Sequence, residues 1–359
     1  MSPASKIAGW TATLLFALPA ARAQQAVVDL SLNENPYGPS PLVVPAVREE
    51  MSGLYRYVTN AEVAELTALL AAKEGVAPEQ IVLGDLLEPL GLYLSLKEGP
   101  GGEFIYSVPG YPALTDAAAR VGGVVIGVPL DRRMENDLPA IAARVGDRTR
   151  AVFLVNPHNP SGTVNDAAKL HEFLRTVSKK ALVVVDEAYL EYSDDFAGRT
   201  AAAHTRAGEN VLVYRTLAKV WGLAGMPLGY AVAPRPVADF LRQQGLGGAH
   251  DQNRLTLVAA AAGLHDPGYI EGVRTAVAAE RVRWHAALDA LGLRHTDSQA
   301  NFVYFDAGRP QTQVAAALQA EGVIVARAFP PYDNWVRITI GLPEENVRAQ
   351  QALRKVLAK

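Results

Sequence analysis

Short apolar runs separated by helical patterns extend along most of the chain. Each run is rich in valine, isoleucine, leucine or phenylalanine and is no longer than seven residues, which is typical of buried strands. The runs are residues 81–84, 103–108, 124–130, 151–155, 181–186 and 211–216. Near-continuous apolar strands that alternate with helices indicate a mostly parallel sheet with both faces covered. The pattern therefore predicts an α/β fold.

One of the intervening helices has clear start and stop signals. Asn60 can cap its N-terminus, and Gly75 and Pro78 end it. Its apolar residues recur at helical spacing on one face, at Val63, Leu66, Leu69 and Leu70. The segment is therefore predicted to be an amphipathic helix.

The order of these patterns divides the chain into two domains. A length of 359 residues with 49% hydrophobic content is enough to bury a large core. We expect residues 51–255 to form a large domain around the sheet. Residues 24–50 and 256–359 would form a smaller α+β domain, and the helix-rich stretch 256–292 would link the two.

The first 23 residues follow a different pattern. Lys6 precedes an apolar stretch at residues 7–20, and an Ala-Arg-Ala motif follows at residues 21–23, which is typical of a cleavable secretory signal. The stretch is too short to span a membrane. The alternative, a buried N-terminal helix, has to explain why no acidic residue occurs before Asp29. We therefore expect an exported, periplasmic protein without membrane attachment after cleavage.

Composition excludes two broad classes of partner. The formal net charge of −3 is mild, and no basic block with interleaved aromatic residues is present, so nucleic-acid binding has no support. The seven histidines show no metal-ligand spacing, so no metal site is predicted. Cysteine is absent, which is compatible with an oxidising compartment.

Polar residues that suit pyridoxal-phosphate chemistry follow three of the predicted strands. This cofactor needs a lysine amine for a covalent imine link and a carboxylate that keeps its pyridine nitrogen protonated, and Lys219 and Asp186 would supply them. Asn159 and Tyr189 could hydrogen-bond its phenolic oxygen. The surrounding motifs are NPHNPSG (156–162), DEAY (186–189) and RTLAKVWGLAGMPLGY (215–230). Because open α/β sheets bind small molecules at the carboxyl ends of strands, this placement is the expected one.

In their order, these motifs resemble those of fold-type I pyridoxal-phosphate enzymes, and among them the class I/II aminotransferases, on the branch similar to histidinol-phosphate aminotransferase. The resemblance runs from SLNENPYGPSP (31–41) to VRITIGLPEEN (336–346). It implies a mostly parallel seven-stranded sheet with helices on both faces, a smaller α+β domain and pyridoxal 5′-phosphate as cofactor. It also implies an amino acid and a 2-oxo acid as substrates. Export argues against a role in cytoplasmic histidine biosynthesis.

The two central residues have simpler interpretations. Asp186 could cap the next helix, as aspartates at strand ends often do. Lys219 could be an exposed lysine at a helix start. Their order along the chain, with small residues at 222–225 that permit close backbone approach, favours the cofactor interpretation.

The resemblance implies further roles for four residues. Tyr111 would stack on the pyridine ring, Thr216 would bind the phosphate, and Tyr57 would reach the phosphate of a neighbouring subunit, which implies a homodimer. Arg337 would bind the α-carboxylate of the substrate with its planar fork. The simpler alternatives are amphipathic tyrosines at the surface of the core, and an arginine on the solvent face of an alternating strand.

Three more residues are expected near the substrate by the same resemblance. They are Asn35, Tyr37 and Asn301. Turn chemistry for Asn35 and packing for the other two are the simpler alternatives.

The phosphate-binding turn departs from the family pattern. The family usually has a Gly-x-Gly-Ser/Thr turn where this chain has GDLLEPLG (84–91), so Leu86 and Leu87 replace hydrogen-bond donors. The serine usually found before the lysine is Ala218, and the usual arginine eight positions after the lysine is Pro227. Each lost charge-assisted bond is worth about 1.5 to 3 kcal/mol, so cofactor binding is expected to be weakened.

Two classes of function remain open from the sequence. The first is an exported aminotransferase, with racemisation, elimination or decarboxylation as alternative reactions of the same cofactor. The second is a non-catalytic descendant that binds a ligand or partner, which the altered phosphate turn suggests. Because a decayed enzyme would be expected to lose some of the ring-binding residues, their presence favours the enzyme.

Overall fold

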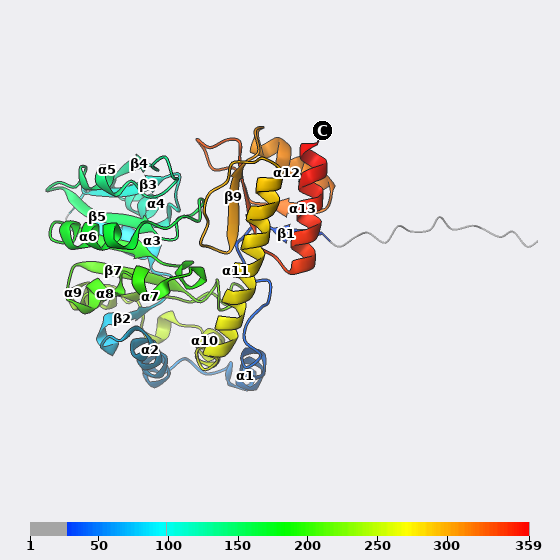
Figure 1. Ribbon diagram of the computed structural model, residues 1–359. Coiled ribbons are helices and arrows are strands. Elements are labelled where there is room, and N and C mark those ends of the chain that lie inside the picture. Colours follow the sequence, from blue (N-terminus) through cyan, green and yellow to red (C-terminus); the bar gives the residue numbers. More distant parts are fainter. Residues whose placement is uncertain (1–26, 98, 359) are drawn as a thin grey trace, which may run out of the picture.

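A seven-stranded sheet forms the centre of the protein (Figure 1). The computed structural model describes residues 27–97 and 99–358, so the predicted secretory signal lies outside the described residues. The strands are β2 (Ile81–Leu83), β3 (Glu103–Val108), β4 (Val124–Pro129), β5 (Thr149–Val155), β6 (Leu182–Asp186), β7 (Val211–Thr216) and β8 (Gly229–Val232). Their order across the sheet is β2-β8-β7-β6-β5-β3-β4.

The sheet is mostly parallel, as predicted. Strands β3 to β7 run in the same direction, and only β8 is antiparallel to its neighbours β2 and β7. The register pairs Val155 of β5 with Asp186 of β6, and Asp186 with Tyr214 of β7. The carboxyl ends of β5, β6 and β7 therefore meet at one edge of the sheet, where the segments carrying the predicted cofactor ligands begin.

Both faces of this sheet are covered by helices. Alternate residues of β6 show this, because Val183 and Val185 belong to one apolar core and Val184 belongs to another. The first core includes residues of α2 (Asn60–Glu74), α6 (Ala167–Val177), α8 (Ala202–Arg206) and α10 (Arg254–Leu264). The second includes residues of α3 (Leu87–Lys97), α4 (Ala113–Arg120) and α9 (Arg235–Gln243). The short helices α5 (Leu138–Ala142) and α7 (Phe196–Arg199) complete this part of the chain.

A smaller α+β region lies beside the sheet (Figure 1). In it, β9 (Phe302–Asp306) pairs antiparallel with β11 (Trp335–Thr339), and β1 (Val28–Leu30) pairs parallel with β10 (Val323–Val325). Its helices are α12 (Gln311–Ala320), α13 (Pro343–Leu357) and part of the long α11 (Pro267–Ala290). The N-terminal strand β1 thus joins the C-terminal part of the chain. Helix α1 (Val43–Glu50) packs instead against α10.

The start of α2 differs by one residue from the prediction. Thr59, not Asn60, caps the helix, and it forms a capping box in which Thr59 and Glu62 exchange hydrogen bonds. The threonine and the glutamate stand three residues apart, which is the spacing that a capping box requires. Gly75 ends the helix as predicted, in the left-handed conformation with φ of 66°.

Within the part of the chain that the structure describes, two kinds of feature are missing. No helix there combines the length and the apolarity that crossing a bilayer requires. No group of three or more histidine or acidic side chains is arranged there to hold a metal ion.

Candidate active site

A cavity of about 220 Å³ opens at the carboxyl ends of β5, β6 and β7. Six of the side chains predicted to bind the cofactor line it: Tyr111, Asn159, Asp186, Tyr189, Thr216 and Lys219. A larger cavity of about 690 Å³ lies against α5 and α6, and none of these six residues lines it. The smaller cavity is therefore the candidate active site, because the titratable groups converge there.

Asp186 is the last residue of β6 and is buried at the base of the cavity. Its Oδ1 accepts a hydrogen bond of 2.9 Å from the backbone N–H of Ala188. Burial raises the pKa of Asp186 to about 7, against the opposing effects of that hydrogen bond and of the Lys219 charge. A buried carboxylate in this position is suited to a cationic ring nitrogen, which would supply the missing counter-charge.

Lys219 lies in the turn that follows β7. Its Nζ donates a 3.3 Å hydrogen bond to the carbonyl of Leu32 and lies 5.7 Å from the centre of the Tyr189 ring. The turn also requires Gly222, which has φ of 72°, because a Cβ there would meet the carbonyl oxygen of Gly38 at 2.2 Å. The small residue thus lets the N-terminal segment pack directly against the loop that carries the lysine.

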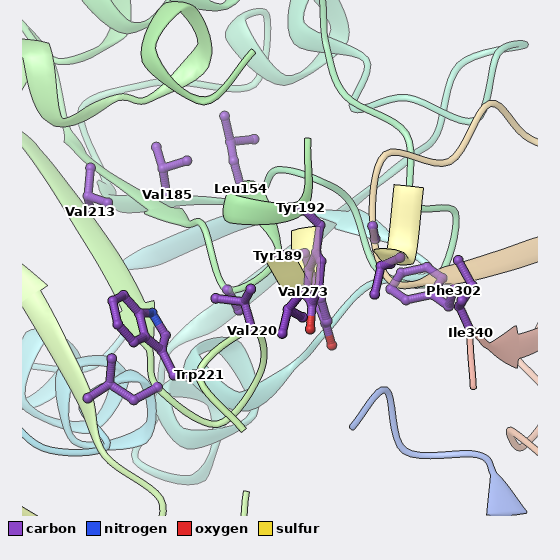
Figure 2. Close-up of a cluster of buried hydrophobic side chains, with 14 of the residues drawn as sticks. Leu154, Val185, Tyr189, Tyr192, Val213, Val220, Trp221, Val273, Phe302 and Ile340 are labelled. Atoms are coloured by element: carbon purple, nitrogen blue, oxygen red, sulfur yellow. The ribbon is translucent and has the colours of Figure 1, made fainter. Parts of the chain in front are cut away.

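Tyr189 is held from two sides. Its ring packs edge-to-face on Phe302 with 5.3 Å between ring centres (Figure 2). Its hydroxyl accepts a 3.1 Å hydrogen bond from the side chain of Asn33. Asn33 is buried with φ of 57°, and Thr339 donates to its side-chain oxygen. Asn33 was not predicted from the sequence. The one signal for it there is its place in the NENP segment, beside the predicted Asn35.

Arg337 lies in the middle of β11 and is 7% exposed. The alternating pattern of its strand would place it in solvent, but all five residues of β11 are buried. Its Nη1 donates to Oδ1 of Asn159 at 2.6 Å and its Nη2 donates to the carbonyl of Ser31 at 2.9 Å. Among the described residues no carboxylate pairs with it, and burial lowers its pKa to about 10. The guanidinium is a buried cation that has only neutral acceptors.

The family model described as "Aminotransferase class I and II" matches residues 25–353. The chain belongs to this family. Members depend on pyridoxal phosphate, and this chain is a pyridoxal-phosphate-dependent aminotransferase. Its arrangement around the central sheet is that of the fold-type I enzymes.

Relatives cover nearly the whole chain. Histidinol-phosphate aminotransferase 2 of Pseudomonas fluorescens is 39% identical over 343 residues, which are 93% of this chain and 90% of the relative. Aromatic amino acid aminotransferase of Thermobifida fusca is 40% identical over 324 residues, which are 88% and 87% of the two chains. A crystal structure of histidinol-phosphate aminotransferase from Sinorhizobium meliloti with pyridoxal-5′-phosphate superimposes with a TM-score of 0.82 at 27% identity, covering 93% and 92%.

The side chains of this aminotransferase fit the ring end of the cofactor. Asp186, Lys219, Asn159 and Tyr189 offer the carboxylate, the amine and the neutral donors that the ring requires. With its oxygen bonded to Arg337, Asn159 would present its amide nitrogen as the donor.

The opposite end of the cavity is less suited to a phosphate. Leu87, Ala218 and Pro227 line it with Thr216, whose hydroxyl accepts a 3.1 Å hydrogen bond from the Ala218 N–H. Asp85 also lines the cavity. The predicted loss of donors at this end is therefore visible in the cavity wall, and it includes an acidic residue that we did not single out from the sequence.

Five of the aminotransferase's predicted site residues do not line the cavity: Arg337, which is bonded to Asn159 in its wall, and Asn301, Asn35, Tyr37 and Tyr57. Asn35 has both side-chain groups engaged in a turn, since its Nδ2 donates to the carbonyls of Gly38 and Val220 and its Oδ1 accepts from the N–H of Tyr37. This is the simpler alternative of turn chemistry. The backbone carbonyl of Tyr37 accepts from the hydroxyl of Tyr269. Tyr57 is 84% exposed and lies in the loop before α2.

Asn301 supports the site indirectly. It is buried, and its Nδ2 donates to the carbonyls of Asn33 and Glu34. It therefore fixes the segment whose Asn33 holds Tyr189, although Asn301 does not line the cavity.

Proposed function

We propose that this aminotransferase moves an amino group between a carboxylate-bearing amino acid and a 2-oxo acid at the cavity around Lys219. The observation that carries the proposal is Arg337, a buried cation that donates to Asn159 in the cavity wall and has no acidic partner among the described residues. Leaving a charge buried and unpaired costs several kcal/mol in real proteins. An α-carboxylate of the substrate would remove this cost, and its two oxygens match the guanidinium fork.

The residues around the ring have separate tasks in this proposal. When bound, pyridoxal phosphate supplies a carbonyl that links to amines and a ring that withdraws electrons from the substrate Cα. The Nζ of Lys219 would hold the cofactor and could accept and return the proton of the substrate Cα. The carboxylate of Asp186 would keep a proton on the ring nitrogen. Asn159 and Tyr189 would donate hydrogen bonds to the phenolic oxygen, and Tyr111 would stack on the ring.

Amino transfer is favoured over the other reactions of the same cofactor. Racemisation, elimination and decarboxylation would use the same lysine and aspartate. The relatives of 39% and 40% identity are both named aminotransferases, which supports amino transfer. Their different names leave the side chain of the substrate to the experiment below.

The assembly we propose is a homodimer. The segment before α2 exposes several large apolar side chains, including Met51 at 54%, Leu54 at 56%, Tyr55 at 77% and Tyr57 at 84%. Exposed apolar patches of this kind mark protein contacts. In the dimer Tyr57 would reach the cofactor of the partner subunit. Sedimentation of the purified chain as a monomer would remove this role for Tyr57.

Export to the periplasm is part of the proposal and depends on residues 1–23. Cell fractionation of the full chain and of a chain starting at residue 24 tests it. Only the full chain should reach the periplasm and lose its N-terminal segment, and retention of both in the cytoplasm would exclude export.

A panel of single half-reactions tests the activity. Aromatic amino acids, glutamate and amines without a carboxylate are each mixed with the loaded enzyme, and the absorbance of the cofactor is followed. Conversion of the cofactor to its amine form with carboxylate-bearing donors is the expected result. Conversion with decarboxylated amines at the same rate would exclude Arg337 as the carboxylate site. Racemised substrate with unchanged cofactor would exclude amino transfer.

A further inference from the structure

The end of the active-site cavity away from the ring lacks positive charge. Of the described residues that line the cavity, only Lys219 carries a positive charge, and its amine is engaged with the Leu32 carbonyl. Leu87, Ala218 and Pro227 line the end of the cavity that is expected to receive the phosphate on the 5′ carbon of the cofactor, which is called the 5′ end below. A phosphate monoester carries a charge of about −1.5 to −2 at neutral pH and is normally bound by arginine, lysine or several N–H donors.

Asp85 adds a negative charge at the same end. It lines the cavity, and its Oδ1 accepts a 3.1 Å hydrogen bond from the buried hydroxyl of Tyr214. A second carboxylate flanks this turn, since Oδ2 of Asp251 lies 3.5 Å from the place where a Cβ on Gly84 would stand. Charges closer together than the ~8 Å Debye length at physiological salt are only partly screened, so Asp85 in the cavity wall would repel a phosphate bound in the cavity.

The helix that starts at this end does not reverse the balance. Helix α3 begins at Leu87, and the partial positive charge of its N-terminus favours anions there. Asp85 precedes the helix by two residues, so its negative charge offsets this partial positive charge.

We propose that the Asp85 carboxylate supplies the negative charge that the cofactor phosphate would otherwise bring to this end of the cavity. This aminotransferase then binds unphosphorylated pyridoxal about as tightly as pyridoxal phosphate. The neutral hydroxymethyl group of pyridoxal donates a hydrogen bond to the Asp85 carboxylate, whereas the phosphate meets it as a like charge. Both compounds share the ring and the aldehyde, so Lys219 and Asp186 contribute equally to the two affinities. The inference rests on the proposed function at Lys219 and concerns only the 5′ end.

A competition experiment measures the ratio of the two affinities directly. The purified full-length enzyme is dialysed to equilibrium against equal concentrations of pyridoxal and pyridoxal phosphate, and the bound compounds are released and separated by chromatography. A bound ratio within about tenfold of unity is expected, since a single charged contact changes affinity by that order. An excess of bound pyridoxal phosphate above about tenfold overturns the proposal.

Two variants that each remove one negative charge show whether Asp85 itself or the net charge of the region sets the ratio of the two affinities. Asp85→Asn should raise the ratio of bound pyridoxal phosphate to pyridoxal about tenfold. Glu88→Gln removes the same charge one turn away, from a side chain that pairs with Arg120 at 3.5 Å and does not line the cavity. It should leave the ratio nearly unchanged. Equal shifts in both variants would assign the effect to net charge and overturn the role of Asp85.

A third variant keeps the test valid if Asp85→Asn does not fold. Pro227 lies in the cavity wall at an exposed loop position, where Pro227→Arg places a cation at the 5′ end. The same competition should then favour pyridoxal phosphate by more than tenfold. An unchanged ratio overturns the inference. Failure of the proposed function gives a different result, since neither compound would then become linked to Lys219.

Discussion

Arg215 and Arg337 are two arginines in strands that are almost completely buried, at 1% and 7% exposure. Arg215 in β7 lies 3.0 Å from a carboxylate oxygen of Glu74 and 3.0 Å from one of Glu187. Arg337 in β11 donates hydrogen bonds to the amide oxygen of Asn159 and to a backbone carbonyl, and it lies over the rings of Phe302 and Phe329, so all these contacts are with uncharged groups. Two carboxylates of the protein balance the charge of Arg215, whereas no carboxylate among the described residues balances that of Arg337.

The pKa values follow this difference. Burial alone would lower the pKa of Arg215, but Glu187 and Glu74 hold it above its usual value. Burial alone would raise the pKa of Glu74, but Arg215 and Lys73 hold it at about 2. Burial of Arg337 lowers its pKa to about 10. Removing one partner of a compensated buried pair leaves the other charge buried and unpaired, whereas an uncompensated buried charge is a candidate site for the charge of a ligand.

Removing the compensated arginine should give the largest change in stability. In Arg215→Met, Glu74 and Glu187 remain buried without their counter-charge. The free energy of unfolding should fall by about 4 kcal/mol, measured by urea denaturation. Adding Glu74→Gln and Glu187→Gln should recover part of that loss. A loss below about 1 kcal/mol would show that the cluster is not a structural ion-pair network.

Removing the uncompensated arginine should act on substrate binding instead. Arg337→Met should lower kcat/KM for carboxylate-bearing amino acids about a hundredfold, or roughly 2.7 kcal/mol, because two charge-assisted hydrogen bonds are lost. The free energy of unfolding should stay the same or increase, since no buried partner is left unpaired. Loss of stability with unchanged kcat/KM would reverse the distinction between the two arginines.

Asp186 extends the comparison to a buried acid. Its pKa is raised to about 7 in the folded protein from 3.8, so the folded state binds the proton more tightly than the unfolded state. The contribution of this pKa difference to the free energy of unfolding is fully present below pH 3.8 and is lost as the pH rises through 7. Between about pH 5 and 6.5 the cofactor-free protein should lose about 2 kcal/mol through this group. Asp186→Asn should reduce the slope without abolishing it, because the pKa of Glu187 is also raised by burial to about 7 and contributes over the same range. An unchanged slope would contradict the assignment to Asp186.

An exposed pair provides the smallest effect. Arg175 and Glu172 on α6 lie 2.9 Å apart with both side chains more than half exposed. Solvent screens such a pair, so Glu172→Ala should leave the urea midpoint unchanged within measurement error. A clear shift would show that proximity alone, and not burial, explains the behaviour of Arg215.

The residues expected around the cofactor ring could be predicted because each one lies at or just after the end of a strand that is recognisable in the sequence. Asn159, Asp186 and Lys219 follow consecutive parallel strands, and the topology of such a sheet brings strand ends together. Asn33 could not be predicted in this way. Its contact with Tyr189 joins residues 156 positions apart, and nothing local indicates the contact.

Three other differences between prediction and structure have separate causes. β8 was absent from the predicted strands because its four residues follow a glycine- and proline-containing turn and include only three apolar side chains. The solvent-facing alternative for Arg337 rested on alternation, which applies to a strand with one face in water, and β11 is buried on both faces. The acidic side chain at the phosphate end, Asp85, was not predicted, because its contact with Tyr214 joins residues 129 positions apart.

The most direct measurement concerns the lysine on which the whole site depends. The enzyme loaded with cofactor is reduced with borohydride, which makes the covalent link permanent, and the labelled peptide is identified by mass spectrometry. Label is expected at Lys219 alone, and none is expected in Lys219→Ala. Label on another lysine, or no label in the parent enzyme, would contradict this expectation.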